Sequence, residues 1–263
     1  MILIDVHAHL DWKDFESELD DIVKRAENAG VKVIISAGID SKSNKKVLEI
    51  AEKYEIVKAA LGLYPPDALA RETNSELISE FKSDINSHVD EELKFIETNK
   101  DKIIAIGEIG LDFLSKKSDL KLQMETFVKQ LKLAKKLDLP VIVHSRKAEA
   151  DVVNILEKEG MKKVVMHCFC GKKRLIKKAI ELGWYFSIPT NVVKSQQFQD
   201  MVEMIPLQQI LTETDSPFLS PYQGMKNEPA FVSEAVKKIA LIKKIEQEEL
   251  ANIIFSNYQR LFL

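Results

Sequence analysis

The chain opens with Met1-Ile2-Leu3-Ile4-Asp5-Val6-His7-Ala8-His9, a short apolar run that ends in two histidines. A run that is apolar at nearly every position is typical of a parallel strand buried on both faces. Seven more runs of this kind follow along the chain. The eight predicted strands cover residues 2–6, 31–37, 56–62, 102–107, 140–144, 163–168, 184–188 and 209–214.

Longer amphipathic stretches separate these runs and predict helices. The clearest spans residues 119–138, with Asp119 as a candidate N-cap. Its apolar positions, spaced by four, three, four and three residues, are Leu120, Met124, Phe127, Leu131 and Ala134. Further helices are expected over residues 75–99, 229–243 and 247–255.

Eight strands that alternate with helices predict a closed (β/α)8 barrel, formed by residues 1–263 as a single domain. A chain of 263 residues has a usual length for one such barrel. The alternative is an open, doubly wound sheet. We disfavour it because no glycine-rich phosphate loop follows the first strand.

The composition limits the classes of protein that fit. Apolar residues make up 45% and charged residues 30%, which excludes wholesale disorder. A formal net charge of −3 excludes a generally basic nucleic-acid-binding coat, so such contacts must come from a local patch. Without a basic leader or an apolar run long enough to cross a bilayer, we expect a cytoplasmic protein with no membrane contact. The sequence predicts no oligomeric state.

Side chains able to bind metal stand at the ends of the predicted strands, where barrels build their active sites. Four of the five histidines occupy such positions, and two carboxylates accompany them. His7 and His9 should point the same way because side chains alternate along a strand. Imidazole and carboxylate groups together suit Zn²⁺, Mn²⁺ or related ions. The candidate ligands are His7, His9, Glu108, His144, His167 and Asp215.

Taken singly, each of these residues could be an ordinary buried or rim group, but six at one rim favour a metal site. His88 lies inside a helical stretch and is expected on the surface or in packing. Glu213 could orient a ligand histidine or simply be a polar core group. Cys168 and Cys170 are too close for an unstrained disulfide, so we expect free thiols in a reducing compartment, with Cys168 facing the helices.

Five strand-end segments carry these residues, and an Asn-Glu-Pro segment follows them. They are Asp5-Val6-His7-Ala8-His9, Gly107-Glu108-Ile109-Gly110-Leu111-Asp112, Val143-His144-Ser145-Arg146, His167-Cys168-Phe169, Glu213-Thr214-Asp215-Ser216-Pro217 and Asn227-Glu228-Pro229. Their order and spacing resemble the TatD-like deoxyribonuclease family of amidohydrolase-type barrels, over essentially the whole chain.

The resemblance implies a metal-dependent hydrolase that acts on phosphodiester bonds, with DNA as the usual substrate. It also implies two divalent ions, the first held by His7, His9 and Asp215 and the second by His144 and His167, with Glu108 between them. The family is often described with Mg²⁺, whereas four imidazoles favour Zn²⁺ or Mn²⁺, so the metal stays open.

Three further roles complete this hypothesis. Asp215 would accept a proton from the attacking water, while Arg146 or Lys226 would contact a flanking phosphate. Departures from the family pattern lie on the substrate side, at Leu63-Tyr64-Pro65-Pro66, Cys170, Lys226 and Ile188-Pro189-Thr190. These departures leave the identity of the substrate open, but they do not put the hydrolytic chemistry in doubt.

Two other functions stay possible from the sequence. The first is a metallohydrolase of the same barrel type that cuts a lactone, amide or phosphotriester. Many of those enzymes bridge their ions with a carboxylated lysine, whereas this chain has Glu108 at the end of the fourth strand. The second is a non-catalytic metal-binding partner protein, which a carboxylate placed to handle protons argues against.

Overall fold

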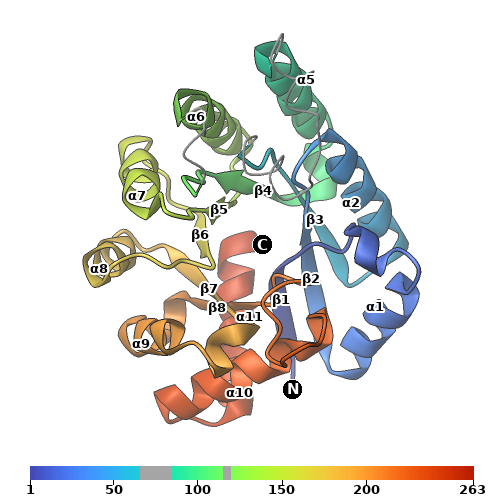
Figure 1. Ribbon diagram of the computed structural model, residues 1–263, viewed down its shortest axis with the longest axis vertical. Coiled ribbons are helices and arrows are strands. Elements are labelled where there is room, and N and C mark those ends of the chain that lie inside the picture. The colour runs from blue at the N-terminus through green and yellow to red at the C-terminus, as the bar shows by residue number, and fades with distance from the viewer. Residues whose placement is uncertain (66–84, 115–119) are drawn as a thin grey trace.

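The computed structural model describes residues 1–65, 85–114 and 120–263. Within these residues, eight strands form one sheet in chain order, and each strand pairs in parallel with the next (Figure 1). The strands are β1 (Leu3–Ala8), β2 (Val31–Ala37), β3 (Val57–Leu61), β4 (Ile103–Gly110), β5 (Val141–His144), β6 (Val164–His167), β7 (Tyr185–Pro189) and β8 (Ile210–Glu213).

Helices surround this ring of strands, as Figure 1 shows. They are α1 (Leu19–Asn28), α2 (Ser41–Lys53), α5 (Ile85–Thr98), α6 (Leu120–Leu137), α7 (Glu149–Lys158), α8 (Lys173–Glu181), α9 (Gln196–Met204), α10 (Val232–Lys243) and α11 (Gln247–Phe262). Short 3-10 turns lie at Lys13–Phe15, Lys100–Lys102, Thr190–Val193, Leu207–Gln209 and Pro229–Phe231. No helix in the described ranges is long and apolar enough to cross a membrane.

The last strand meets the first and completes the ring. Just beyond β8, the backbone N–H of Asp215 donates to the carbonyl of His7 at 2.9 Å, and that of His9 donates to Ser216 at 2.8 Å. Deeper in the barrel, the Thr212 hydroxyl donates to the carbonyl of Ile4 at 2.6 Å. The predicted (β/α)8 barrel is therefore confirmed, while the assignment of residues 1–263 to a single domain stays a prediction.

All eight predicted strands are present, but three of them end later than the apolar pattern indicates, β7 by the single residue Pro189. β1 continues to Ala8, which pairs with Ser36, and β4 continues to Gly110, which pairs with His144. Backbone pairing continues in both places where polar side chains interrupt the apolar run. His7 and Glu108 consequently lie inside strands rather than after them.

The predicted helices are largely confirmed within the described ranges. In α6, Phe127, Leu131 and Ala134 are fully buried, whereas Leu120 at the first turn is 45% exposed. The expected N-cap Asp119 and residues 75–84 lie outside the described residues.

The C-terminal helix α11 extends beyond the predicted residue 255 to Phe262. The Asn257 side chain donates to the carbonyls of Leu207 and Ile210 at 2.7 and 2.8 Å, at the start of β8. α11 therefore lies at the amino end of the strands, opposite to the end where Asp215 follows β8. The carboxyl ends are left for the candidate site.

Candidate metal centre

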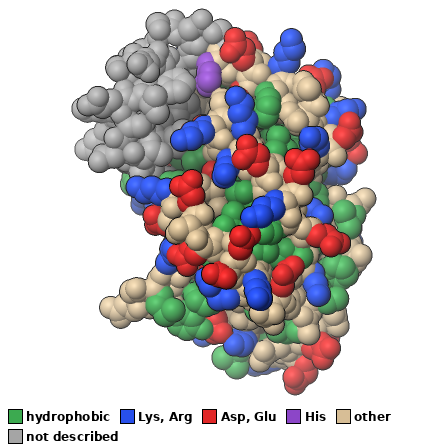
Figure 2. Space-filling view, turned by 90° about the vertical axis from the view of Figure 1, so that its right-hand side faces the viewer, with side chains coloured by type: hydrophobic (Ala, Val, Ile, Leu, Met, Phe, Trp, Pro, Cys, Tyr) green, Lys and Arg blue, Asp and Glu red, His purple; other side chains and the backbone are tan. Residues whose placement is uncertain are grey.

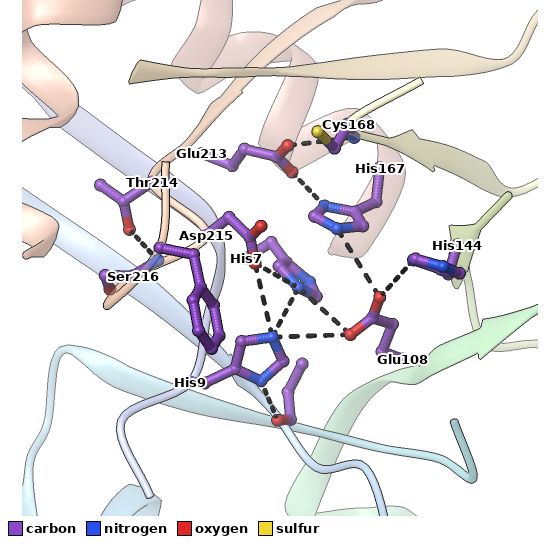
Figure 3. Close-up of polar contacts among 12 residues, drawn as sticks. His7, His9, Glu108, His144, His167, Cys168, Glu213, Thr214, Asp215 and Ser216 are labelled. Atoms are coloured by element: carbon purple, nitrogen blue, oxygen red, sulfur yellow. Dashed lines mark hydrogen bonds and ion pairs between the residues drawn. The ribbon is translucent and has the colours of Figure 1, made fainter. Parts of the chain in front are cut away.

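Three predicted ligands gather on one side of the Glu108 carboxylate (Figure 3). The Nε2 atoms of His7 and His9 lie 3.6 and 3.5 Å from Oε2 of Glu108. The same two nitrogens lie 3.5 and 3.4 Å from Oδ1 of Asp215. Two imidazoles and two carboxylates therefore face a common point, with His7 and His9 pointing the same way as predicted.

The other two predicted ligands approach the second oxygen of the same carboxylate. Nδ1 of His144 lies 3.0 Å from Oε1 of Glu108, and Nε2 of His167 lies 3.6 Å from it. Figure 3 shows the Glu108 carboxylate between the two sets of histidines. The structure therefore brings all six predicted residues together. Glu108 lies at the centre, and the other five come from β1, β5, β6 and β8 or from the residues just beyond these strands.

The donor atoms fit a metal site by their chemistry as well as their positions. Within the described residues, three overlapping triples hold ligand atoms that all lie within 4.8 Å of one another. The triples are His7–His9–Glu108, His7–His167–Asp215 and Glu108–His144–His167. Imidazole nitrogens and carboxylate oxygens at such spacing are the donors that Zn²⁺ and Mn²⁺ use in proteins.

A glycine allows β4 and β5 to approach closely at the centre. Gly110 has φ of +145°, and a Cβ on it would lie 2.0 Å from the carbonyl oxygen of His144. No other residue fits this position without moving the backbone. The close pairing of Gly110 with His144 sets Glu108 and His144 side by side.

Most of the histidines are held by a second contact on the other ring nitrogen. Nδ1 of His167 lies 2.8 Å from Glu213, and Nε2 of His144 lies 3.2 Å from Asp112. Nδ1 of His9 lies 3.2 Å from the carbonyl oxygen of Ala37. Of the two roles considered for Glu213, the contact supports the orientation of a candidate ligand.

Sequence reasoning did not single out Asp112 or Tyr64. The Tyr64 hydroxyl lies 3.2 Å from Nε2 of His144, on the ring nitrogen that also contacts Asp112. Asp112 was visible in the Gly-Glu-Ile-Gly-Leu-Asp segment, and Tyr64 in the departure from the family pattern after the third strand. Their position beside His144 can be recognised only once β3, β4 and β5 are known to be neighbouring strands.

Two buried glutamines of α6 hold the loops that carry these residues. The Gln123 side chain accepts from the backbone N–H of Asp112 at 2.9 Å and donates to its carbonyl at 3.0 Å. Gln130 forms the same pair of bonds with Leu63, at 2.7 and 3.0 Å. Each amide therefore fixes a strand-end loop beside His144.

Asp5 ties the first strand to the last beneath the centre. This fully buried carboxylate accepts hydrogen bonds from the backbone N–H and the hydroxyl of Thr214, at 2.9 and 2.6 Å. Burial raises the pKa of Asp5 to about 8, although the bonds from Thr214 oppose the shift. Asp5 thus fixes the backbone on which His7 and Asp215 stand.

The central carboxylates are held in their ionised form. Burial would raise the pKa of Glu108, but the bond from His144 and the charges of the neighbouring histidines lower it to about 2. For Asp215, burial is likewise outweighed by hydrogen bonds from His7 and His9, so its pKa lies below the usual range. Both groups are therefore anionic at neutral pH and ready to bind cations.

The histidines differ in proton affinity. Burial would lower the pKa of His9, but Asp215 and Glu108 raise it to about 9. Burial is also outweighed at His167, where Glu213 raises the pKa to about 10. The pKa of His7 is instead lowered, chiefly by burial. In the metal-free protein, His9 and His167 therefore carry protons at neutral pH.

A cavity of about 930 Å³ opens above the centre and is lined by five of the six residues, all but the fully buried His7. Arg146 lines it, with its guanidinium 3.8 Å from the Asp112 carboxylate and 48% exposed. Lys226 is placed elsewhere: its Nζ donates to the carbonyl of Asp14 at 2.6 Å and to the Glu18 carboxylate at 2.7 Å. A phosphate contact by Arg146 suits this placement, and one by Lys226 stays a prediction.

The two cysteines are free thiols, but one expectation about them was wrong. Cys168 lines the cavity together with Cys170 instead of facing the helices. β6 ends at His167, and Cys168 takes the left-handed conformation with φ of 44°, so the strand alternation stops there. His88 is half-buried against the Ser41 hydroxyl at 3.2 Å, away from the centre, as expected.

Comparison with known sequences agrees with this geometry. A family model described as TatD related DNase matches residues 4–263. Deoxyribonuclease TATDN3 of Homo sapiens is 35% identical, over 99% of this chain and 94% of its own length. The uncharacterized metal-dependent hydrolase YabD of Bacillus subtilis is 34% identical, over 99% of both chains.

A solved structure shares the architecture along its whole length. The crystal structure of YjjV, a TatD homolog from Escherichia coli K12, superposes with a TM-score of 0.86 at 28% identity. The likeness covers 99% of this chain and 97% of that one. From the family match, the relatives and the clustered ligands, this chain belongs to the TatD-related DNase family and is a metal-dependent hydrolase on a (β/α)8 barrel.

Proposed function

We propose that the protein binds two divalent metal ions and hydrolyses phosphodiester bonds, with DNA or a related phosphodiester as substrate. The observation that carries this proposal is the Glu108 carboxylate, which presents one oxygen to His7 and His9 and the other to His144 and His167. A carboxylate in this place can join two cation sites. The name of the human relative, a deoxyribonuclease, supports the substrate class.

Each of the six residues has a proposed role. His7, His9 and Asp215 would hold the first ion, His144 and His167 the second, and Glu108 both. When bound, a pair of divalent ions lowers the pKa of a water molecule and offsets charge on a phosphoryl group. The native metal could be Zn²⁺, Mn²⁺ or Mg²⁺.

Asp215 is the proposed proton acceptor. Its side chain lines the cavity and is 15% exposed, whereas that of Glu108 is 4% exposed. Its carboxylate is ionised, so it can orient an attacking water molecule and accept its proton. Arg146 at the cavity wall would hold a phosphate oxygen through its planar guanidinium.

The distribution of surface charge supports a nucleic-acid contact at the cavity rather than over a broad face. Figure 2 shows lysine and arginine side chains interspersed with acidic ones, without a continuous basic surface among the described residues of this face. Two basic residues, Arg146 and Lys147, line the cavity itself. A small local patch of this kind suits a substrate that enters the cavity.

The test pairs metal analysis with hydrolysis of an end-labelled oligonucleotide in the presence of Mn²⁺, Zn²⁺ or Mg²⁺. We expect about two ions per chain and metal-dependent cleavage. His144→Ala should lower both, while His88→Ala, which removes a histidine outside the centre, should change neither. Hydrolysis of a lactone or amide without any phosphodiester cleavage would overturn the proposed substrate class.

A further inference from the structure

Two aromatic rings stand beside the metal centre and have no part in the proposed chemistry. Trp12 and Phe218 both line the cavity, with ring centroids 5.2 Å apart and planes at 75°. Their centroids lie 6.4 and 6.2 Å from the ring of His9. An edge-to-face pair of this kind is a stable arrangement for two aromatic side chains.

The backbone holds both rings at fixed distances from the centre. The N–H of Trp12 donates to the carbonyl of His9 at 3.2 Å, and that of Phe218 donates to the carbonyl of Asp215 at 2.9 Å. Each ring therefore follows a candidate ligand by one tight turn. The Asn227 side chain also donates to the carbonyl of Phe218 at 2.6 Å.

Lys226 connects the two segments that carry these rings. It lies in the loop after β8, beyond Phe218, and its Nζ donates to the carbonyl of Asp14, two residues after Trp12. The same ammonium lies 5.1 Å from the centroid of the buried Phe15 ring. These contacts hold the two aromatic segments together in the structure as it stands.

Phe218 is exposed to a degree that packing does not explain. It is 42% exposed although it lies next to a buried cluster of charged groups. Tyr222 in the same loop is 40% exposed but lies off the cavity, where its ring packs against Phe231. A large apolar ring exposed at the cavity mouth is a surface for a ligand.

The cavity wall has two chemically different sides. The aromatic pair adjoins His9 and Asp215, whereas Arg146 contacts Asp112, which in turn contacts His144. A ligand that spans the centre would meet flat apolar surface on one side and positive charge on the other. A nucleotide unit, with its planar base and its phosphate, has this pairing of properties.

We propose that Trp12 and Phe218 form a stacking platform for the nucleobase next to the phosphodiester bond that is cut, with the base stacked on the face of one ring and in contact with the other at its edge. This subsite rests on the proposed function and adds a contact with the base. Stacking accepts any base because every base has a flat aromatic face. A base on the platform cannot also be stacked in a duplex, so the bound nucleotide is unpaired.

The first test compares an oligothymidylate with the same strand carrying an abasic residue beside the cleaved bond. Trp12→Ala and Phe218→Ala should each raise KM for the intact strand by about 5- to 100-fold, with little change in kcat. For the abasic strand the change should stay below about twofold, because no base is present to stack.

Matched variants separate stacking from a merely structural role. Tyr222→Ala removes a ring of similar exposure from the same loop, and it should leave KM unchanged for both strands. Trp12→Phe and Phe218→Tyr keep a flat ring and should restore most of the loss. Equal losses on the intact and abasic strands, or no loss on either, would overturn the platform.

The second test measures binding without turnover. Trp184 is fully buried, so quenching by a ligand in the cavity reports on Trp12. A phosphorothioate-linked oligothymidylate, which keeps the negative charge and resists hydrolysis, should quench the fluorescence of the metal-loaded wild type but not of Trp12→Phe. Absence of quenching in the wild type overturns the platform. Quenching without cleavage of any phosphodiester supports the platform and overturns only the proposed function.

Discussion

The two halves of the metal centre differ in how many side chains they offer. On the side of β1 and β8, His7 and His9 face one oxygen of Glu108, and both also contact Asp215. On the side of β5 and β6, His144 and His167 are the two side chains in the described ranges that face the other oxygen. A site with fewer protein ligands keeps positions open for water or substrate. In the proposed two-metal arrangement, the first site would therefore be closed and the second more open.

The contacts of the outer ring nitrogens, those turned away from Glu108, favour the opposite side of the centre. His144 and His167 each contact a carboxylate, from Asp112 and Glu213. Among the described residues, Nδ1 of His9 contacts a carbonyl oxygen, and Nδ1 of His7 has no hydrogen-bond partner. A carboxylate partner fixes the ring and makes its nitrogen a stronger donor. The side with fewer ligands therefore has the better supported imidazoles.

The largest effect is expected where the two halves share a residue. Glu108→Ala removes an oxygen from both sets, so both ions should bind more weakly and turnover should fall by more than about 100-fold, beyond the usual loss from an outer-contact mutation. Metal content and kcat would be measured together. Glu149→Ala, which removes a carboxylate of the cavity wall outside the cluster, should keep both near normal.

A folded Glu108→Ala protein with two ions and normal turnover would refute the shared role of this carboxylate. Circular dichroism would verify that the barrel is intact in both variants.

A mutation on one side should affect one ion only. Glu213→Gln keeps the shape of the side chain but weakens its support of His167, so the second ion should bind about 10- to 100-fold more weakly. Metal titration should then show one tight and one weak site. Equal weakening of both sites would contradict the independence of the two halves.

The two halves should also release different numbers of protons when they bind metal. Ligand histidines must be neutral. In the metal-free protein the pKa of His9 is raised to about 9, while that of His7 is lowered. The pKa of His167 is raised to about 10, and that of His144 is also raised, since Asp112 and Glu108 outweigh its burial.

Metal affinity should consequently rise with pH, up to about pH 9 at the first site, where His9 loses its proton, and up to about pH 10 at the second, where His167 does. At pH 7 the first site releases a proton from His9 and the second one from His167, and the raised pKa of His144 favours a larger release at the second site. Calorimetry in buffers of different ionisation enthalpy would count these protons. A larger release of protons at the first site than at the second would contradict this prediction.

The smallest effect is expected at Tyr64. Tyr64→Phe removes a hydroxyl that lies 3.2 Å from His144 while Asp112 still contacts the same nitrogen. One neutral hydrogen bond contributes about 0.5–1.5 kcal/mol, so the affinity for the second ion should fall only about 2- to 10-fold. The first ion should be unaffected, and metal titration of Tyr64→Phe beside the wild type would measure both.

Sequence reasoning identified the barrel and the six clustered residues for physical reasons that are local. Parallel strands buried on both faces leave continuous apolar runs, as in Val141–His144. Polar residues that directly follow such runs, as His9 and Asp215 do, must lie at the same end of a parallel barrel. Residue type and position along the chain are enough to predict the barrel and the residues that cluster at one end of it.

The contacts between distant segments could only come from the tertiary structure. The bonds of Gln130 to Leu63 and the contact of Tyr64 with His144 join segments about 67 and 80 residues apart. No local pattern encodes which loop a buried amide will meet. The same holds for Lys226, which meets Asp14 and Glu18 across the first and last loops.

The amino-acid sequence by itself therefore determined the fold class and the candidate ligands, because hydrophobic periodicity and strand-end chemistry are written along the chain. The tertiary structure decided the pairing of each Glu108 oxygen with its histidines, the carboxylates behind His144 and His167, and the aromatic pair at the cavity mouth. These depend on the register between strands and the direction of side chains, which only the closed barrel sets.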